Sequence, residues 1–220
     1  MIDDVLPVEI LTLQLLPNLS PGLAQRFSLP AGYRSIGLIS TDCDDVTYMA
    51  LDEATKVSNV EVVYGRSLYA GAANASTKLA GEVIGVIAGP TPSEVVSGLE
   101  GARAFLQSGV GFRSANDTGD VVYLAHCVSR TGNYLSQVAG IPAGRAIAYL
   151  VAPPVEAVVG LDAAMKAADV ELCTFFEPPT ETNFAGGLLT GTQSACQAAC
   201  DAFAEAVKAV AAVPADMGGN

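Results

Sequence analysis

The chain contains Leu23-Ala24-Gln25 followed by Leu29-Pro30-Ala31-Gly32, and the pattern returns as Leu135-Ser136-Gln137 followed by Ile141-Pro142-Ala143-Gly144. Leu, Gln, Pro, Ala and Gly recur at a spacing of 112 residues, from Leu23 to Leu135. Solenoid units repeat every ~20–50 residues, so a period this long indicates two whole domains of one fold.

Two further matches extend the repeat. Asp52-Glu53-Ala54-Thr55-Lys56 corresponds to Asp162-Ala163-Ala164-Met165-Lys166 at a spacing of 110, and Ala80–Ile84 aligns with Ala185–Leu189 at 105. The order is kept while the spacing shrinks, as small deletions would produce. We therefore predict one domain over residues 1–109 and a second over 110–220. Two copies in one chain can occupy two positions of a symmetric ring.

Each half shows the same order of apolar runs and helical patterns, typical of an α/β layered sandwich. Strands are expected at Val8–Leu16, Ser35–Ser40, Val60–Tyr64 and Glu82–Ala88, and again at Val121–Val128, Ala146–Ala152, Val170–Phe175 and Gly187–Thr190. Helices are expected at Pro21–Phe27, Val46–Ser58 and Pro92–Gln107, and again at Asn133–Ala139, Val155–Ala168 and Thr192–Val213.

The composition indicates a protein with extensive subunit contacts. Half of the residues are hydrophobic, 15% are charged and the mean hydropathy is +0.39. No run of ~18 apolar residues predicts a membrane span, and the acidic N-terminus, Met1-Ile2-Asp3-Asp4, does not resemble a secretory signal. We expect a cytoplasmic protein. A net charge of −12 disfavours nucleic acid as a partner and is compatible with cationic or neutral small molecules.

No set of catalytic residues emerges from the motifs. His126, the only histidine, precedes Cys127 in an apolar run, and neighbours in a strand point to opposite faces. Phosphate-binding, dinucleotide-binding and nucleophile-elbow motifs are missing. Cys196 and Cys200 are four residues apart, which suits core packing better than half of a metal site. We expect reduced thiols, no cofactor, no metal and no enzymatic activity.

The densest polar feature is Thr41-Asp42-Cys43-Asp44-Asp45, after a predicted strand. One reading is that these aspartates cap the following helix. Three carboxylates exceed what capping needs, so a small ammonium or divalent cation is the other reading. The second half has Ala152-Pro153-Pro154-Val155-Glu156 at this place, so the cluster belongs to one copy only.

Two long loops at corresponding places are rich in small residues, Pro and Asn: Gly65–Thr77 and Glu177–Gly187. Loops of this length in compact domains are often functional.

Several long motifs resemble the EutL-type shell proteins of ethanolamine-utilisation bacterial microcompartments, over nearly the whole chain. They are Gly37–Tyr48, Val62–Ala72, Val128–Gly132, Ala148–Pro154 and Pro178–Asn183. The resemblance implies two tandem, circularly permuted bacterial microcompartment (BMC) domains. Three chains would form a flat pseudohexameric trimer that tiles with other shell proteins into a hexagonal lattice, with a gated central pore and small pores within the subunits.

The resemblance also implies site residues. The small-pore site for ethanolamine, or a similar small amine, corresponds to Asp44, Asp45, Glu82, Phe112 and Thr182. The gating loops correspond to Tyr69, Ala70, Gly71, Asn183 and Phe184. Carboxylates suit a primary ammonium because they accept charge-assisted hydrogen bonds, and the Phe112 ring could add a cation–π contact.

Two other classes of function stay open at this point. A duplicated α/β scaffold could serve as a small-amine sensor that does not tile into a lattice. An enzyme with Cys127 or Cys43 as nucleophile is the third reading.

Overall fold

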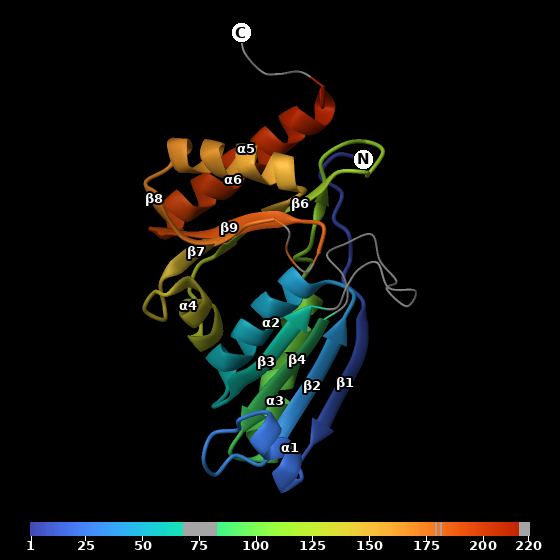
Figure 1. Ribbon diagram of the computed structural model, residues 1–220, viewed down its shortest axis with the longest axis vertical. Coiled ribbons are helices and arrows are strands. Elements are labelled where there is room, and N and C mark those ends of the chain that lie inside the picture. Colours follow the sequence, from blue (N-terminus) through green and yellow to red (C-terminus); the bar gives the residue numbers. More distant parts are fainter. Residues whose placement is uncertain (68–82, 179, 181, 216–220) are drawn as a thin grey trace. The chain divides into compact units, whose positions relative to one another are not determined.

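The computed structural model describes residues 1–67, 83–178, 180 and 182–215, and it divides into two compact units (Figure 1). Unit 1 comprises Met1–Leu6, Gly111–Thr131 and the chain from Ala139 onwards; unit 2 comprises Pro7–Val110 and Gly132–Val138. Each unit thus takes a short segment from the other half of the sequence. The domain boundary at 109/110 stays a prediction about the repeat.

Unit 2 is built on a four-stranded antiparallel sheet in the order β1-β2-β4-β3. Its strands are β1 (Ile10–Leu16), β2 (Ser35–Thr41), β3 (Glu61–Ser67) and β4 (Val83–Gly89). Its helices are α1 (Pro21–Arg26), α2 (Asp44–Val57) and α3 (Pro92–Leu106), and most of α4 (Asn133–Ala139) is added to them.

Helices cover both faces of the unit 2 sheet. Gly37 of β2 lies against Leu99 of α3, and Gly85 of β4 lies against Leu51 of α2, so α2 and α3 share one face. Successive strand residues point to opposite faces, which places Ile36 on the other face. There Ile36 packs in a cluster that includes Phe27, next to the end of α1. The sheet is therefore the middle layer of an α/β sandwich.

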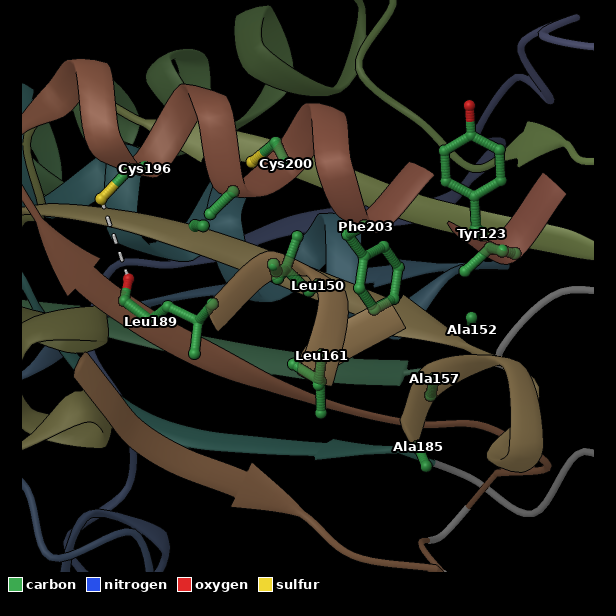
Figure 2. Close-up of a cluster of buried hydrophobic side chains, with 14 of the residues drawn as sticks. Tyr123, Leu150, Ala152, Ala157, Leu161, Ala185, Leu189, Cys196, Cys200 and Phe203 are labelled. Carbon is green, nitrogen blue, oxygen red and sulfur yellow. Dashed lines mark hydrogen bonds between the residues drawn. The ribbon is translucent and has the colours of Figure 1, made fainter. Parts of the chain in front are cut away.

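Unit 1 is built on a sheet in the order β5-β6-β7-β9-β8, and its two helices pack together on one face of that sheet. Its strands are β5 (Arg113–Ser114), β6 (Val122–Val128), β7 (Ala146–Ala152), β8 (Val170–Phe176) and β9 (Ala185–Gly191), and its helices are α5 (Pro154–Ala167) and α6 (Gln193–Ala212). The core lies between this sheet and the two helices (Figure 2). Gly160 of α5 lets the Phe203 ring of α6 approach closely, because a Cβ at Gly160 would lie 2.6 Å from that ring.

The predicted α/β fold is confirmed, and the two sheets share one strand order apart from β5. Apart from the additional strand β5, the differences are confined to element ends. β3 continues to Ser67, so the first residues of the predicted Gly65–Thr77 loop are strand, and α2 begins at Asp44 rather than Val46. The sequence did not predict β5, because two residues are too few to show an alternating pattern.

The predicted spacing of 105 residues near the end of each half is wrong. In the sheets, Val83 pairs with Thr41 at the end of β2, and Ala185 pairs with Ala152 at the end of β7. Val83 therefore corresponds to Ala185. The spacing of 105 residues had instead paired Val83 with Leu188, which is three positions further on. The pairing of strands in each sheet decides which residues of the two halves correspond, and a match of Ala and Gly residues does not reveal that pairing.

The first six residues form an edge of unit 1. Asp3 N–H donates to the Ser114 carbonyl at 2.8 Å, and Leu6 N–H donates to the Phe112 carbonyl at 2.8 Å. The Asp3 carboxylate accepts from the Tyr123 hydroxyl at 2.6 Å and pairs with Lys208 at 3.2 Å. Within the part of the chain that the structure describes, no helix is long and apolar enough to cross a membrane.

Candidate functional site

The acidic segment predicted from the sequence forms the turn between β2 and α2. Thr41 ends the strand and Asp44 begins the helix. Asp42 Oδ1 accepts from Glu9 N–H at 2.8 Å, and Asp42 N–H donates to the Glu9 carbonyl at 3.2 Å. Asp42 therefore ties the segment before β1 to the turn, a structural role that the sequence did not reveal.

The capping reading fits the turn only in part. The N-cap residue of α2 is Cys43, whose side chain makes no capping hydrogen bond with the described residues. Asp44 and Asp45 instead lie in the first helical turn, where the positive end of the helix dipole favours negative charge. Asp45 N–H donates to Asp44 Oδ1 at 2.9 Å. Thr47 Oγ1 donates to the Cys43 carbonyl at 2.8 Å and secures the turn.

The carboxyl group of Asp44 is buried, and this sets its proton affinity. Burial first, and then the neighbouring charge of Asp45, raise the pKa of Asp44 from 3.8 to about 8. Removing the charged form from water costs more than the nearby backbone hydrogen bonds return. Without a ligand, Asp44 is therefore largely protonated at neutral pH, and a cation brought close would favour its ionisation.

Ser67, at the end of β3, adds a second polar group beside Asp44. Its hydroxyl favours the charged form of Asp44 and opposes part of the rise in pKa. The contact falls short of a hydrogen bond, because Ser67 Oγ is buried and has no hydrogen-bond partner among the described residues. Buried hydroxyls are usually satisfied, so this oxygen could still accept a donor. Ser67 was not among the predicted site residues. The alternation of side chains along a β-strand was the one sequence signal that assigns Ser67 to a face of the sheet.

The remaining predicted site residues that the structure describes lie in unit 1. Phe112 is fully buried, and its ring lies 5.2 Å from that of Phe184, centroid to centroid. Thr182 N–H donates to Thr180 Oγ1 at 3.2 Å, and Thr180 Oγ1 donates to the Phe184 carbonyl at 2.9 Å. These threonine contacts brace the segment that carries Asn183.

The structure thus brings Asp44 together with Asp45, and Phe112 together with Phe184. The first pair lies in unit 2 and the second in unit 1. A single site comprising both pairs stays a prediction. Glu82 and the gating residues Tyr69, Ala70 and Gly71 lie outside the described residues.

The thiols do not resemble nucleophiles. Burial raises the pKa of Cys43 well above its ordinary value, and burial also raises that of Cys127. Cys196 and Cys200 lie in the core of unit 1, where burial raises the pKa of Cys196 to about 11 (Figure 2). Catalytic cysteines need a lowered pKa. Among the described residues, no three His, Cys, Asp or Glu side chains are grouped to hold a metal ion.

Comparisons with known proteins place these features in a family. The BMC domain family matches residues 35–115. The Bacterial microcompartment shell protein EutL of Clostridium perfringens is 63% identical over 212 residues, covering 96% of this chain and 98% of that protein. The same-named protein of Escherichia coli K12 is 51% identical, covering 96% of each. The crystal structure of ethanolamine utilization protein EutL from Leptotrichia buccalis superposes with a TM-score of 0.94 at 59% identity, covering 98% of this chain and 100% of that chain.

The duplicated α/β units and the matching domain define a shell protein built from BMC domains. The similar proteins are named as shell proteins, which are structural rather than catalytic. These relatives confirm the expectation that the chain is not an enzyme. Within that class, the chain belongs to the EutL family of bacterial microcompartment shell proteins.

Proposed function

We propose that this shell protein serves an ethanolamine-utilisation microcompartment, as a homotrimer that tiles with other shell proteins into a hexagonal lattice. Family membership supports the shell role, and a solved EutL from Leptotrichia buccalis is described as an ethanolamine utilization protein. Three chains with two similar units each give six similar positions, which suits a hexagonal lattice.

We further propose that the Asp44–Asp45 pair binds the ammonium group of ethanolamine or a similar small amine. The observation that carries this proposal is the burial of both carboxyl groups at the start of α2. Burial raises the pKa of Asp44, so this carboxyl group gains when a cation replaces its proton. Ser67 Oγ offers an additional acceptor. Glu82, Phe112 and Thr182 are proposed as further contributors.

Ligand binding would also control the central pore. Tyr69, Ala70, Gly71, Asn183 and Phe184 are proposed to form the gating loops. A ligand shifts two conformations only by its difference in affinity for them. A tenfold preference for the closed form is worth ~1.4 kcal/mol per site, and three sites in a trimer would contribute ~4 kcal/mol.

A calorimetric titration with ethanolamine tests the amine site. Because Asp44 must give up its proton, binding below pH 8 should release up to about one proton per site. The observed heat should then depend on the ionisation enthalpy of the buffer, and affinity should rise up to about tenfold per pH unit between pH 6 and 8. Asp45→Ala should abolish saturable binding at millimolar ligand.

The matched control is Asp120→Asn, which removes an exposed carboxylate from the loop before β6. It should bind as the unmodified protein does. Binding with the same heat in every buffer, or unchanged affinity in Asp45→Ala, would remove Asp44 and Asp45 from the site. Electron microscopy of the concentrated protein tests the shell role separately. Hexagonal sheets support it, whereas discrete particles that bind the amine would favour a sensor.

A further inference from the structure

Helix α4 packs on helix α2 within unit 2, and this contact is held by specific polar groups. The Asp52 carboxylate accepts from Gly132 N–H at 2.7 Å and from Leu135 N–H at 2.8 Å. Thr55 Oγ1 accepts from Asn133 N–H at 3.0 Å, and the Tyr48 and Tyr134 rings lie 6.3 Å apart. Tyr48, Asp52 and Thr55 are four and three residues apart, so they share one face of α2.

The same face exists on α5, where nothing in the described chain covers it in the same way. Helices α2 and α5 begin at Asp44 and Pro154, so Tyr48, Asp52 and Thr55 correspond to Val158, Asp162 and Met165. We call these three residues the α5 face. Asp52 is 0% exposed, whereas Val158 is 50% and Met165 43% exposed, and the Asp162 side chain is 62% exposed.

The ion pair beneath this face is present in both copies. Lys56 pairs with Asp52 at 3.1 Å, and Lys166 pairs with Asp162 at 2.6 Å. The Asp–Lys pair of the α4 contact is thus repeated on α5, whereas apolar Val158 and Met165 stand where α2 has Tyr48 and Thr55. Exposed apolar side chains grouped on one surface mark an interaction site, so Val158 and Met165 indicate that the α5 face is covered in an assembly.

Helix α1 is the counterpart of α4, but α1 leaves exposed the residues that α4 buries against α2. Leu23 is 50% exposed, whereas its counterpart Leu135 is 1% exposed. The side chain of the α1 N-cap residue, Ser20, makes no capping hydrogen bond with the described residues. Gly22, which corresponds to Tyr134, has open space where a Cβ would lie.

We infer that α1 of one chain docks on the α5 face of a second copy, reproducing between chains the contact that α4 makes with α2. Asp162 of the receiving chain accepts from the backbone N–H groups of Ser20 and Leu23, and Leu23 becomes buried over Val158 and Met165. A second copy is the occupant because α1 carries the Leu-x-Gln pattern of α4, the helix that already fills the matching place on α2.

The contact joins two different surfaces, so it is heterologous and propagates around a ring until the ring closes. This inference rests on the proposed homotrimer. In that trimer, three α4–α2 contacts within chains alternate with three α1–α5 contacts between chains, and this alternation creates the near-sixfold symmetry.

Sedimentation of the full chain tests the contact with two charge substitutions at exposed positions, Leu23→Glu and Val158→Glu. The unmodified protein should sediment as a trimer, and each variant should sediment as a single chain of 22.4 kDa. Mixed in equal amounts, the two variants should form a two-chain complex, because one α1 and one α5 face remain intact. Asp162→Ala should weaken assembly by about tenfold to a hundredfold.

Val96→Glu is the matched control. Val96 is exposed on α3, and its counterpart on α6, Gln197, is polar and exposed. This variant should remain trimeric, and circular dichroism should show that all variants are folded. Trimers in both Leu23→Glu and Val158→Glu would overturn the α1–α5 contact and leave the trimer intact. A monomeric unmodified protein would instead overturn the trimer itself and, with it, this contact.

Discussion

Asp42, Asp44 and Asp45 lie within four residues of one another, yet they have different environments. Asp42 is bound to the backbone of Glu9, whereas Asp44 is buried beside Asp45 at the start of α2. The sequence showed the concentration of carboxylates and the asymmetry between the halves. Burial could not be read from it, because the spacing of acidic residues does not tell which side chains the fold removes from water.

The raised pKa of Asp44 predicts how stability depends on pH. The folded state holds the proton up to about pH 8, whereas the unfolded chain releases it near 3.8. Between these values the folded state binds more protons, so the free energy of unfolding should fall as pH rises. The slope from this group reaches about 1.4 kcal/mol per pH unit.

Urea unfolding at pH 5 and pH 8, without amine, measures this dependence. Asp44→Asn keeps the neutral shape, so its stability should fall less between the two pH values than that of the unmodified protein. Asp120→Asn should leave the dependence unchanged. Equal pH dependence in Asp44→Asn and the unmodified protein would contradict a buried, protonated Asp44.

At the scale of helices and strands, α2 and α5 show that one sequence pattern can serve two places. Both carry an Asp followed four residues later by a Lys, and the sequence alignment detected this match at a spacing of 110. Strand and helix positions followed from alternating and helical periodicity, so nearly all elements could be predicted. The docking of α4 on α2 could not, because periodicity shows which face is apolar and not which neighbour covers it.

Replacing Asp52 should release α4 from α2. Asp52→Ala removes the acceptor for two buried backbone N–H groups and leaves Lys56 without one of its carboxylate partners. We expect a loss of about 2–4 kcal/mol in the free energy of unfolding. Hydrogen exchange should show faster exchange of the Gly132 and Leu135 amides.

Glu53→Ala is the control for this change, because Glu53 also pairs with Lys56, at 2.5 Å, but is partly exposed. Exposed ion pairs contribute about 0–1 kcal/mol, so the loss should be small and the α4 amides should stay protected. Unchanged exchange at Gly132 and Leu135 in Asp52→Ala would show that packing alone holds α4.

At the scale of the whole molecule, the two units are interleaved along the sequence. Residues 1–6 complete unit 1, whereas Gly132–Val138 complete unit 2. The repeat predicted two similar units, and their shared strand order is observed. The repeat did not predict this exchange of segments, because the similarity between the two halves is the same whichever unit a segment packs in.

Removing residues 1–6 should destabilise unit 1. The truncation eliminates the backbone bonds to Phe112 and Ser114 and the Asp3 contacts with Tyr123 and Lys208. We expect a loss of about 2–4 kcal/mol, measured by thermal unfolding, with faster hydrogen exchange at Ser114. Removing only Met1 and Ile2 should have little effect, and an equal loss in both truncations would contradict the role of Asp3 to Leu6.

The contact between Asp3 and Lys208 spans 205 residues, so the ribosome adds 205 residues after Asp3 before its partner exists. At roughly 5–20 residues per second, Asp3 waits on the order of 10–40 s for its partner. Unit 2 needs only the chain as far as Val138 and can close first. Residues 1–6 therefore lack their Lys208 contact while unit 2 closes, and during this interval they are open to exchange between nascent chains on neighbouring ribosomes.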